Sequence, residues 1–92
     1  MKFQVILSNE ATDNYNFIFD YIALDNPFKA KEFTDEILAR ISSLEDFPYT
    51  GNEITKNERY ISKKPYKIFY TINEETHRIE ITHIRHGARD EL

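Results

Sequence analysis

The feature that most constrains the fold is a pair of alternating runs near the end of the sequence. Residues 66–72 and 78–84 each place apolar side chains at every second position over most of their length, and five mostly polar residues, 73–77, connect them. Such alternation is typical of strands with one buried face, and a short polar connection between them predicts an antiparallel hairpin. A hairpin alone is marginally stable, so we expect the rest of the chain to cover its apolar face.

The second run departs from strict alternation at one point. Ile79 and Ile81 would lie on one face of a regular strand, whereas Ile84 would lie on the opposite face. A β-bulge near residues 82–83 would return Ile84 to the apolar face, and it would also change the direction of Arg85 and His86. We therefore expect a bulge there.

The chain before this hairpin predicts a strand and two helices. Residues 2–8 alternate, which favours a strand. Ser8 or Asn9 is suited to cap the first helix, and Asn26-Pro27 is suited to open the second. The short break between the helices predicts an antiparallel helical hairpin. The apolar residues at helical spacing are Ala11, Tyr15, Ile18 and Ile22, then Ala30, Phe33, Ile37, Ile41 and Leu44.

After the second helix we expect Phe47 to pack into the core, residues 52–58 to form a polar loop and residues 59–62 a short strand. The order β-α-α-β-β-β predicts an α+β fold in which the helical hairpin covers one face of a small antiparallel sheet. The other face stays open, and its side chains are mixed enough to be solvated or to bind a partner. They include Lys67, Phe69, Thr71, Arg78, Glu80 and Thr82.

The composition limits the class of protein. Residues 1–92 suffice for one domain, and the absence of Cys excludes disulfides and Cys-based metal sites. The apolar stretch near the N-terminus is too short for a signal peptide or a membrane span, so we expect a cytoplasmic protein without a membrane partner. The net charge is −4, with −5 in residues 1–50 and +1 in residues 51–92. A surface for a polyanion would therefore be a local patch in the C-terminal half.

Several landmarks occur in a fixed order along the chain. They are Ala11 in the first helix, Asn26-Pro27 and Ala30 in the second, LEDFPYTG at residues 44–51, YKIFY at residues 66–70 and HGARD at residues 86–90. In this order and spacing they resemble the RelE/ParE superfamily of bacterial toxins, and its ParE branch in particular. The resemblance covers essentially the whole chain.

The resemblance implies the toxin of a type II toxin–antitoxin system, neutralised by a cognate antitoxin whose helices often enter apolar grooves of the toxin. ParE-like members are associated with poisoning DNA gyrase, which we take as the expected target, with no cofactor and no metal. RelE-like members are ribosome-dependent endonucleases, so cleavage of ribosome-bound mRNA is the alternative. A non-toxic antitoxin-binding module is a third interpretation.

Cleavage of RNA requires a general base, a general acid and cations at the phosphate. If the chain is RelE-like, the resemblance points to Arg59, Lys67, Arg85 and His86. No aromatic residue follows His86, however, unlike the RelE pattern, and the net acidity fits poorly with docking on ribosomal RNA. The sequence therefore favours a protein-binding toxin without catalytic residues of its own.

Two sets of residues are candidates for protein contacts. The C-terminal residues Arg85, His86, Arg89 and Asp90 form a candidate target-binding tail, although Arg89 and Asp90 equally suit a salt bridge that ties the tail to the fold. His83 and His86, three residues apart at a strand end, favour a surface role over a metal site. The candidates for binding the antitoxin are Phe17, Tyr21, Phe28 and Phe69. The three helical ones among them either form an exposed patch or belong to a wide core stripe.

Overall fold

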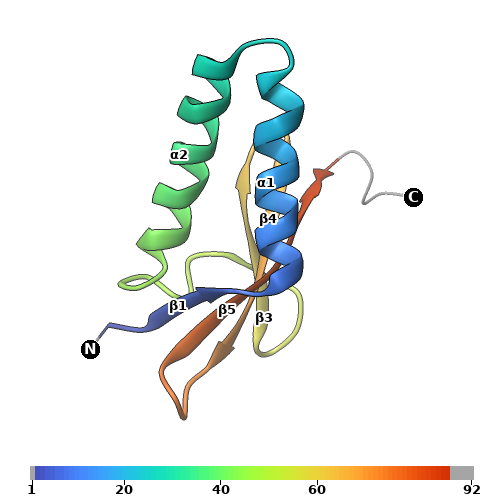
Figure 1. Ribbon diagram of the computed structural model, residues 1–92. Coiled ribbons are helices and arrows are strands. Elements are labelled where there is room, and N and C mark those ends of the chain that lie inside the picture. The colour runs from blue at the N-terminus through green and yellow to red at the C-terminus, as the bar shows by residue number, and fades with distance from the viewer. Residues whose placement is uncertain (1, 88–92) are drawn as a thin grey trace.

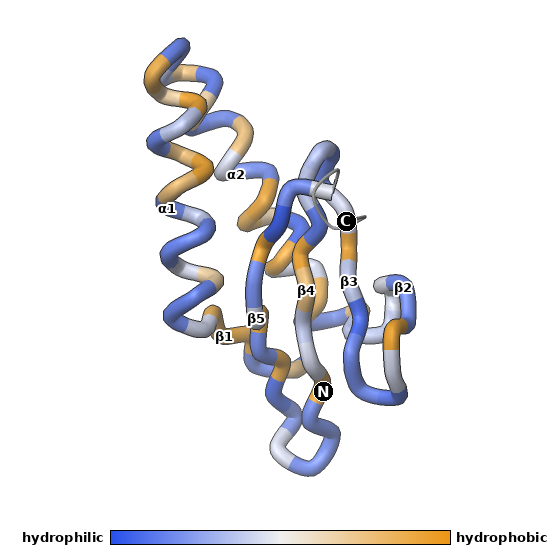
Figure 2. Tube along the Cα trace, turned by 90° about the vertical axis from the view of Figure 1, so that its right-hand side faces the viewer, coloured by the Kyte–Doolittle hydropathy of each residue, from blue (hydrophilic) through white to orange (hydrophobic). Residues whose placement is uncertain are grey.

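The computed structural model describes residues 2–87, in which two helices pack on one face of a five-stranded sheet. Figures 1 and 2 show the helices as one layer and the sheet as the other. The predicted α+β fold and its element order are confirmed, with one additional short strand, β2, in the segment expected to be a loop. The elements are β1 (Gln4–Leu7), α1 (Asn9–Ala23), α2 (Pro27–Ser43), β2 (Asn52–Glu53), β3 (Glu58–Lys63), β4 (Tyr66–Asn73) and β5 (Arg78–His86).

The sheet is mixed and not purely antiparallel as expected. Its strand order is β1-β5-β4-β3-β2, and β1 runs parallel to β5 while the other neighbours are antiparallel. A four-residue alternating strand carries no information about the direction of its partner, because both kinds of pairing preserve the period of two. The helical hairpin connects β1, at one edge of the sheet, to β2 at the opposite edge. The chain then returns strand by strand, and β5 becomes the parallel neighbour of β1.

The predicted bulge in β5 is confirmed. Phe69 lies opposite His83 and Tyr70 lies opposite Ile81, which leaves Thr82 as the extra residue. Ile84 is consequently buried on the same side as Ile79 and Ile81. Beyond the bulge, alternation directs His86 to the helix side of the sheet and Arg85 to the opposite side.

The helix caps follow from the sequence. The Ser8 side-chain oxygen accepts a hydrogen bond from the Ala11 N–H at 3.0 Å, and the Asn26 side-chain oxygen accepts bonds from the N–H groups of Phe28 and Lys29. The Ser8 hydroxyl also donates to the Thr82 carbonyl at 2.8 Å. One side chain thus begins α1 and ties it to the bulge in β5.

We expect Ser8→Ala to lower the free energy of unfolding by about 1–2 kcal/mol, because the cap and the bond to Thr82 are lost together. Urea unfolding followed by circular dichroism measures the change. Ser42→Ala is the matched control, since Ser42 is exposed on α2 and alanine has a high helix propensity. An equal loss of stability in both variants would contradict this role for Ser8.

The core lies between the helices and the helix side of the sheet. Ala11 and Ala30 are fully buried, and their small side chains allow the backbones of the helices to approach their neighbours. The other buried apolar residues are Ile18, Ile37, Ile41, Leu44, Ile68, Tyr70, Ile72, Ile79, Ile81 and Ile84. The expectation that Phe47 joins them is wrong, because Leu44 occupies the end of the core and the Phe47 side chain is 65% exposed. No helix in residues 2–87 is both long and apolar enough to cross a membrane.

Candidate functional site

A groove runs between α1, α2 and the Pro65 end of the sheet, and we call it the α1 groove. It has a volume of about 610 Å³, within the range usual for ligand pockets. Phe17 and Tyr21 form one rim, with ring centroids 6.3 Å apart in a stacked arrangement. The lining residues are Asn14, Phe17, Ile18, Tyr21, Ile22, Phe33, Pro65, Tyr66, Ile84, Arg85 and His86.

The rim continues as an apolar seam toward the tip of the helical hairpin. Phe17 and Tyr21 are 65% and 63% exposed, and Leu24 and Phe28 are 87% and 88% exposed. The spacing of 17, 21 and 24 places three of these residues along one line of α1, which is the pattern of a helix that packs beside another helix. The groove and the seam together therefore form one elongated apolar surface, the kind that marks a partner site on a soluble protein.

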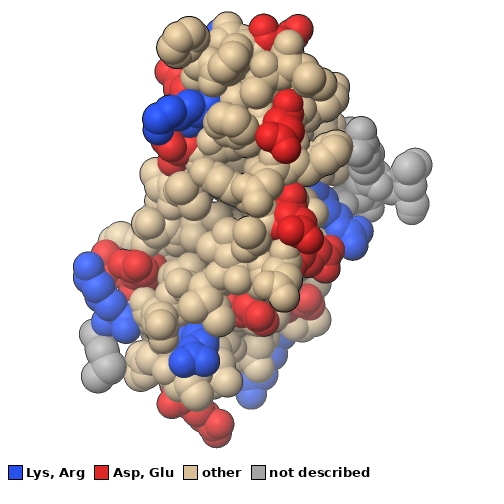
Figure 3. Space-filling view, in the orientation of Figure 1, with Lys and Arg blue, Asp and Glu red and all other residues tan. Residues whose placement is uncertain are grey.

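Acidic side chains border this surface. Asp and Glu residues lie along the course of α1 on the face shown in Figure 3. Asp13 and Asp20 of α1 are exposed, and each lies one helical turn from Phe17 on the side away from the groove. A partner segment that packs on the seam would meet negative charge along this edge.

The floor of the α1 groove is held in place by ring contacts and one hydrogen bond. The Tyr66 ring lies edge-on to Phe33 and to His86, at centroid distances of 5.8 and 5.3 Å. The Asn14 side-chain oxygen accepts a hydrogen bond from the Ile84 N–H at 2.9 Å, on the edge of β5 beyond the end of β1. The groove is thus preorganised by side chains of α1, α2, β4 and β5.

The open face of the sheet carries three rows of side chains that cross β3, β4 and β5. The register places Ser62, Lys67 and Arg85 side by side in a basic row. Next to it lies an aromatic row of Tyr60, Phe69 and His83, and then an acidic row of Glu58, Thr71 and Glu80. The open face therefore has a basic row and an acidic row on either side of the aromatic one, and Arg78 of β5 lies beyond the acidic row.

The aromatic row is continuous across the three strands. The Phe69 ring stacks on His83 at 4.4 Å and lies 5.6 Å from the tilted ring of Tyr60. The Lys67 ammonium lies 5.0 Å from the centre of the Tyr60 ring, close enough for a cation–π contact between the basic and aromatic rows.

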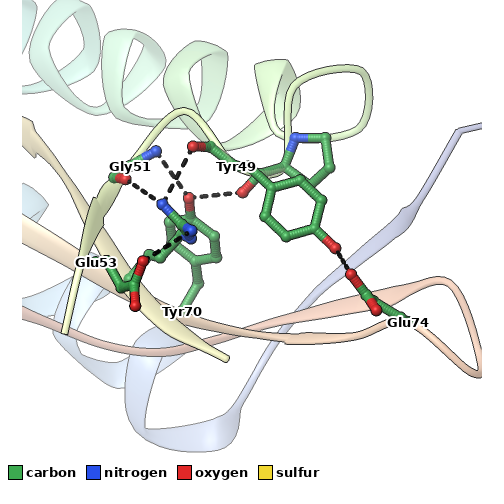
Figure 4. A network of polar contacts seen from close by, with 7 residues as sticks. Tyr49, Gly51, Glu53, Tyr70 and Glu74 are labelled. Carbon is green, nitrogen blue, oxygen red and sulfur yellow. Dashed lines mark hydrogen bonds and ion pairs between the residues drawn. The ribbon is translucent and has the colours of Figure 1, made fainter. Parts of the chain in front are cut away.

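Arg59 lies on the other side of the sheet and organises the loop that follows α2. Figure 4 shows Tyr49, Gly51, Glu53 and Glu74 of this network. The Arg59 guanidinium donates to the carbonyl oxygens of Gly51 at 2.9 Å and Tyr49 at 3.3 Å, and it lies 3.4 Å from the Glu53 carboxylate. It also lies over the Tyr49 ring, whose hydroxyl donates to Glu74. Arg59 is therefore engaged in holding the loop against the sheet.

The Tyr70 hydroxyl closes the same network. It donates to the Pro48 carbonyl at 2.8 Å and accepts from the Gly51 N–H at 3.1 Å. Burial of the phenol raises the pKa of Tyr70, while the Gly51 N–H and the charge of Arg59 act in the opposite direction. The hydroxyl is thus a neutral hydrogen-bonding group that links loop and sheet.

The structure divides the candidate catalytic set between the two faces of the sheet. Arg59 and His86 lie on the helix side, whereas Lys67 and Arg85 belong to the basic row of the open face, and Arg85 also lines the mouth of the α1 groove. His83 and His86 likewise point to opposite faces. No group of three or more His, Cys, Asp or Glu residues suited to a metal occurs in residues 2–87.

The candidate antitoxin-binding residues also divide. Phe17, Tyr21 and Phe28 are exposed along α1 and the start of α2, which favours an exposed patch over a wide core stripe, whereas Phe69 lies on the open face. Arg89 and Asp90 of the candidate target-binding tail lie outside the described residues. Sequence reasoning missed Leu24, whose spacing from Phe17 and Tyr21 signals the seam, and also Tyr60 and His83, which join Phe69 only once the strand register is known.

Solved structures of several toxin–antitoxin proteins share this architecture. It is similar to the chromosomal ParDE system of P. aeruginosa, with a TM-score of 0.76 and 18% identity over 92% of this chain and 96% of the other. It is also similar to the RelBE2 complex of Mycobacterium tuberculosis, with a TM-score of 0.71 and 13% identity over 94% and 99% of the two chains. A mutant of E. coli RelE in the free state is similar as well, with a TM-score of 0.71 and 9% identity over 99% of this chain and 90% of the other. At these identities the comparison establishes a shared fold.

No curated protein matches the sequence. The family model of the ParE toxin of type II toxin–antitoxin systems, however, matches residues 5–91, which is nearly the whole chain. Together with the fold, this match identifies the family. The chain belongs to the ParE toxin family.

Proposed function

We propose that this protein is a toxin that acts by binding DNA gyrase and is neutralised by a cognate antitoxin seated in the α1 groove. The observation that carries the second half of the proposal is the elongated apolar surface formed by the groove and its seam. The family match and the structural likeness to the ParDE system of P. aeruginosa support the first half.

The shape and charge of the α1 surface define the antitoxin segment that fits it. A groove with a straight apolar seam accepts an amphipathic helix, whose apolar side covers Phe17, Tyr21 and Leu24. Asp13 and Asp20 favour Lys or Arg along one edge of that helix. Because most of the contact is apolar, we expect the affinity to change little between low and moderate salt.

The arrangement of the basic residues favours a protein target over RNA cleavage. A nuclease places its base, its acid and its phosphate-binding cations within hydrogen-bond reach of one phosphodiester. The four residues that the RelE-like alternative requires lie on opposite faces of the sheet, and Arg59 is engaged by the carbonyls of Tyr49 and Gly51.

Expression of the chain without its antitoxin tests the target. We expect growth arrest, loss of negative supercoiling in a reporter plasmid and intact mRNA, and the purified chain should inhibit supercoiling by gyrase in vitro. Codon-phased cuts in ribosome-bound mRNA would establish the endonuclease alternative instead. Normal growth with tight antitoxin binding would identify a non-toxic binding module.

A further inference from the structure

We propose that Asn14 determines the register of the antitoxin helix in the α1 groove, by donating a hydrogen bond to an oxygen acceptor on that helix. The inference rests on the proposed function, because it takes the antitoxin helix to lie along the α1 seam. It concerns which helix fits and in what position, which apolar contacts alone leave open.

Asn14 lies on the same line of α1 as the apolar seam. Steps of three, four and three residues lead from Asn14 to Phe17, Tyr21 and Leu24, which is the alternation of a and d positions in a coiled-coil heptad. Asn14 also lines the groove together with Phe17 and Tyr21. A partner helix that covers these two rings therefore passes over Asn14 as well.

The Asn14 side chain presents hydrogen-bond donors to the groove. Its oxygen accepts the Ile84 N–H at 2.9 Å, where β5 extends beyond β1. This bond fixes which end of the amide is the oxygen, because a backbone N–H requires an acceptor. Within residues 2–87 no hydrogen bond uses the side-chain nitrogen, and this atom is not buried. In the free chain its two N–H groups are therefore open to water.

A bound helix removes these N–H groups from water, and a buried donor without an acceptor is unfavourable. The backbone carbonyls of a helix are bonded within the helix, so the acceptor has to be a side-chain oxygen, such as that of Asp, Glu, Asn or Gln. A shift of the antitoxin helix by one turn would place an apolar side chain over Asn14 and leave the donor unpaired. A single polar residue at an a position fixes the register of paired helices in the same way. The antitoxin segment should thus carry one such acceptor among apolar residues spaced three and four apart.

Asn14→Asp tests the donor alone. The carboxylate still accepts the Ile84 N–H, so the free energy of unfolding should stay close to that of the parent, whereas the two N–H groups are lost. We expect the affinity for the antitoxin to fall at least about tenfold, because an acceptor then meets an acceptor. Isothermal titration measures the loss. It should persist at about 0.5 M salt, where long-range repulsion between charges is screened.

Asn16→Asp is the matched control, because Asn16 lies on the same helix, is exposed and does not line the groove. It gains the same charge and should bind the antitoxin as the parent does. Heteronuclear NMR observes the donor directly in the unsubstituted chain. The side-chain N–H pair that is absent from the spectrum of Asn14→Asp should exchange with water more slowly in the complex than in the free chain.

Parental affinity of Asn14→Asp, an equal loss of affinity in Asn16→Asp, or unchanged exchange of the Asn14 N–H pair would overturn the inference. In each of these cases the antitoxin still lies in the groove if joint replacement of Phe17 and Tyr21 with alanine weakens its binding. If that double replacement leaves the affinity unchanged, the antitoxin lies elsewhere, and the proposed seat and the role of Asn14 are both wrong.

Discussion

Replacing Phe17 and Tyr21 together with alanine is expected to weaken binding of the antitoxin at least about 100-fold. The two rings stack on each other at the junction of the α1 groove and its seam, with 65% and 63% of their surfaces exposed. Aromatic residues at the centre of an interface commonly dominate its energy, because the partner removes their large apolar area from water. Isothermal titration of the purified chain with its antitoxin measures the effect.

Phe47 provides the control for this experiment. Its side chain is also 65% exposed, but it lies in the loop after α2 and does not line the α1 groove. Phe47→Ala should bind the antitoxin as the parent does, and the free energy of unfolding should change little in either variant. If Phe47→Ala weakens binding as much as the double replacement, the antitoxin does not occupy the groove and its seam.

Gly51→Ala is expected to lower the free energy of unfolding by about 2–3 kcal/mol. A Cβ at this position would lie 2.5 Å from the Tyr70 hydroxyl and 2.7 Å from the Tyr60 carbonyl oxygen. Neither atom moves freely, since Tyr60 is sheet backbone and the Tyr70 hydroxyl is bonded to Pro48. Urea unfolding measures the loss. Gly87→Ala is the matched control, with a nearest contact of 3.1 Å and a smaller expected effect.

A double-mutant cycle with Tyr70→Phe tests the cause of that loss. Tyr70→Phe alone removes a hydrogen-bond partner from both Gly51 and Pro48, which costs about 1–3 kcal/mol. It also removes the atom that a Cβ at position 51 would meet first. The double variant should therefore be more stable than the two single effects predict, by at least about 0.5 kcal/mol. Strict additivity would show that contact with the Tyr70 hydroxyl is not the reason for the glycine.

Local patterns in the sequence predicted most of the fold. The caps at Ser8 and Asn26 and the bulge at Thr82 follow from nearest-neighbour chemistry and from the changed parity of Ile84, so they need no tertiary information. The parallel pairing of β1 and the exposure of Phe47 depend on how distant segments meet, which a pattern of period two or 3.6 does not encode.

The candidate sites were less predictable for the same reason. The aromatic residues of α1 exceed what one core stripe accommodates, but their spacing fits both an exposed patch and a wide core stripe, and only the packed structure decides between them. The rows on the open face depend instead on the register of three strands, and a shift by one residue would move Tyr60 to the other face and Arg59 to the open one. The resemblance points to Arg59 for an RNA site only if the chain is RelE-like, and the structure shows its guanidinium bonded to the carbonyls of the loop after α2.

The place of β5 between β1 and β4 also determines when the protein acquires its surfaces during synthesis. Its parallel partner β1 lies beside it at the edge of the sheet but 74 residues earlier in the chain, as the pairing of Gln4 with Arg78 shows. Ribosomes add about 5–20 residues per second, so β1 is synthesised several seconds before β5. Until then the α1 groove lacks Ile84 and His86, and the basic row lacks Arg85. The α1 groove and the basic row are therefore completed together, when β5 joins the sheet.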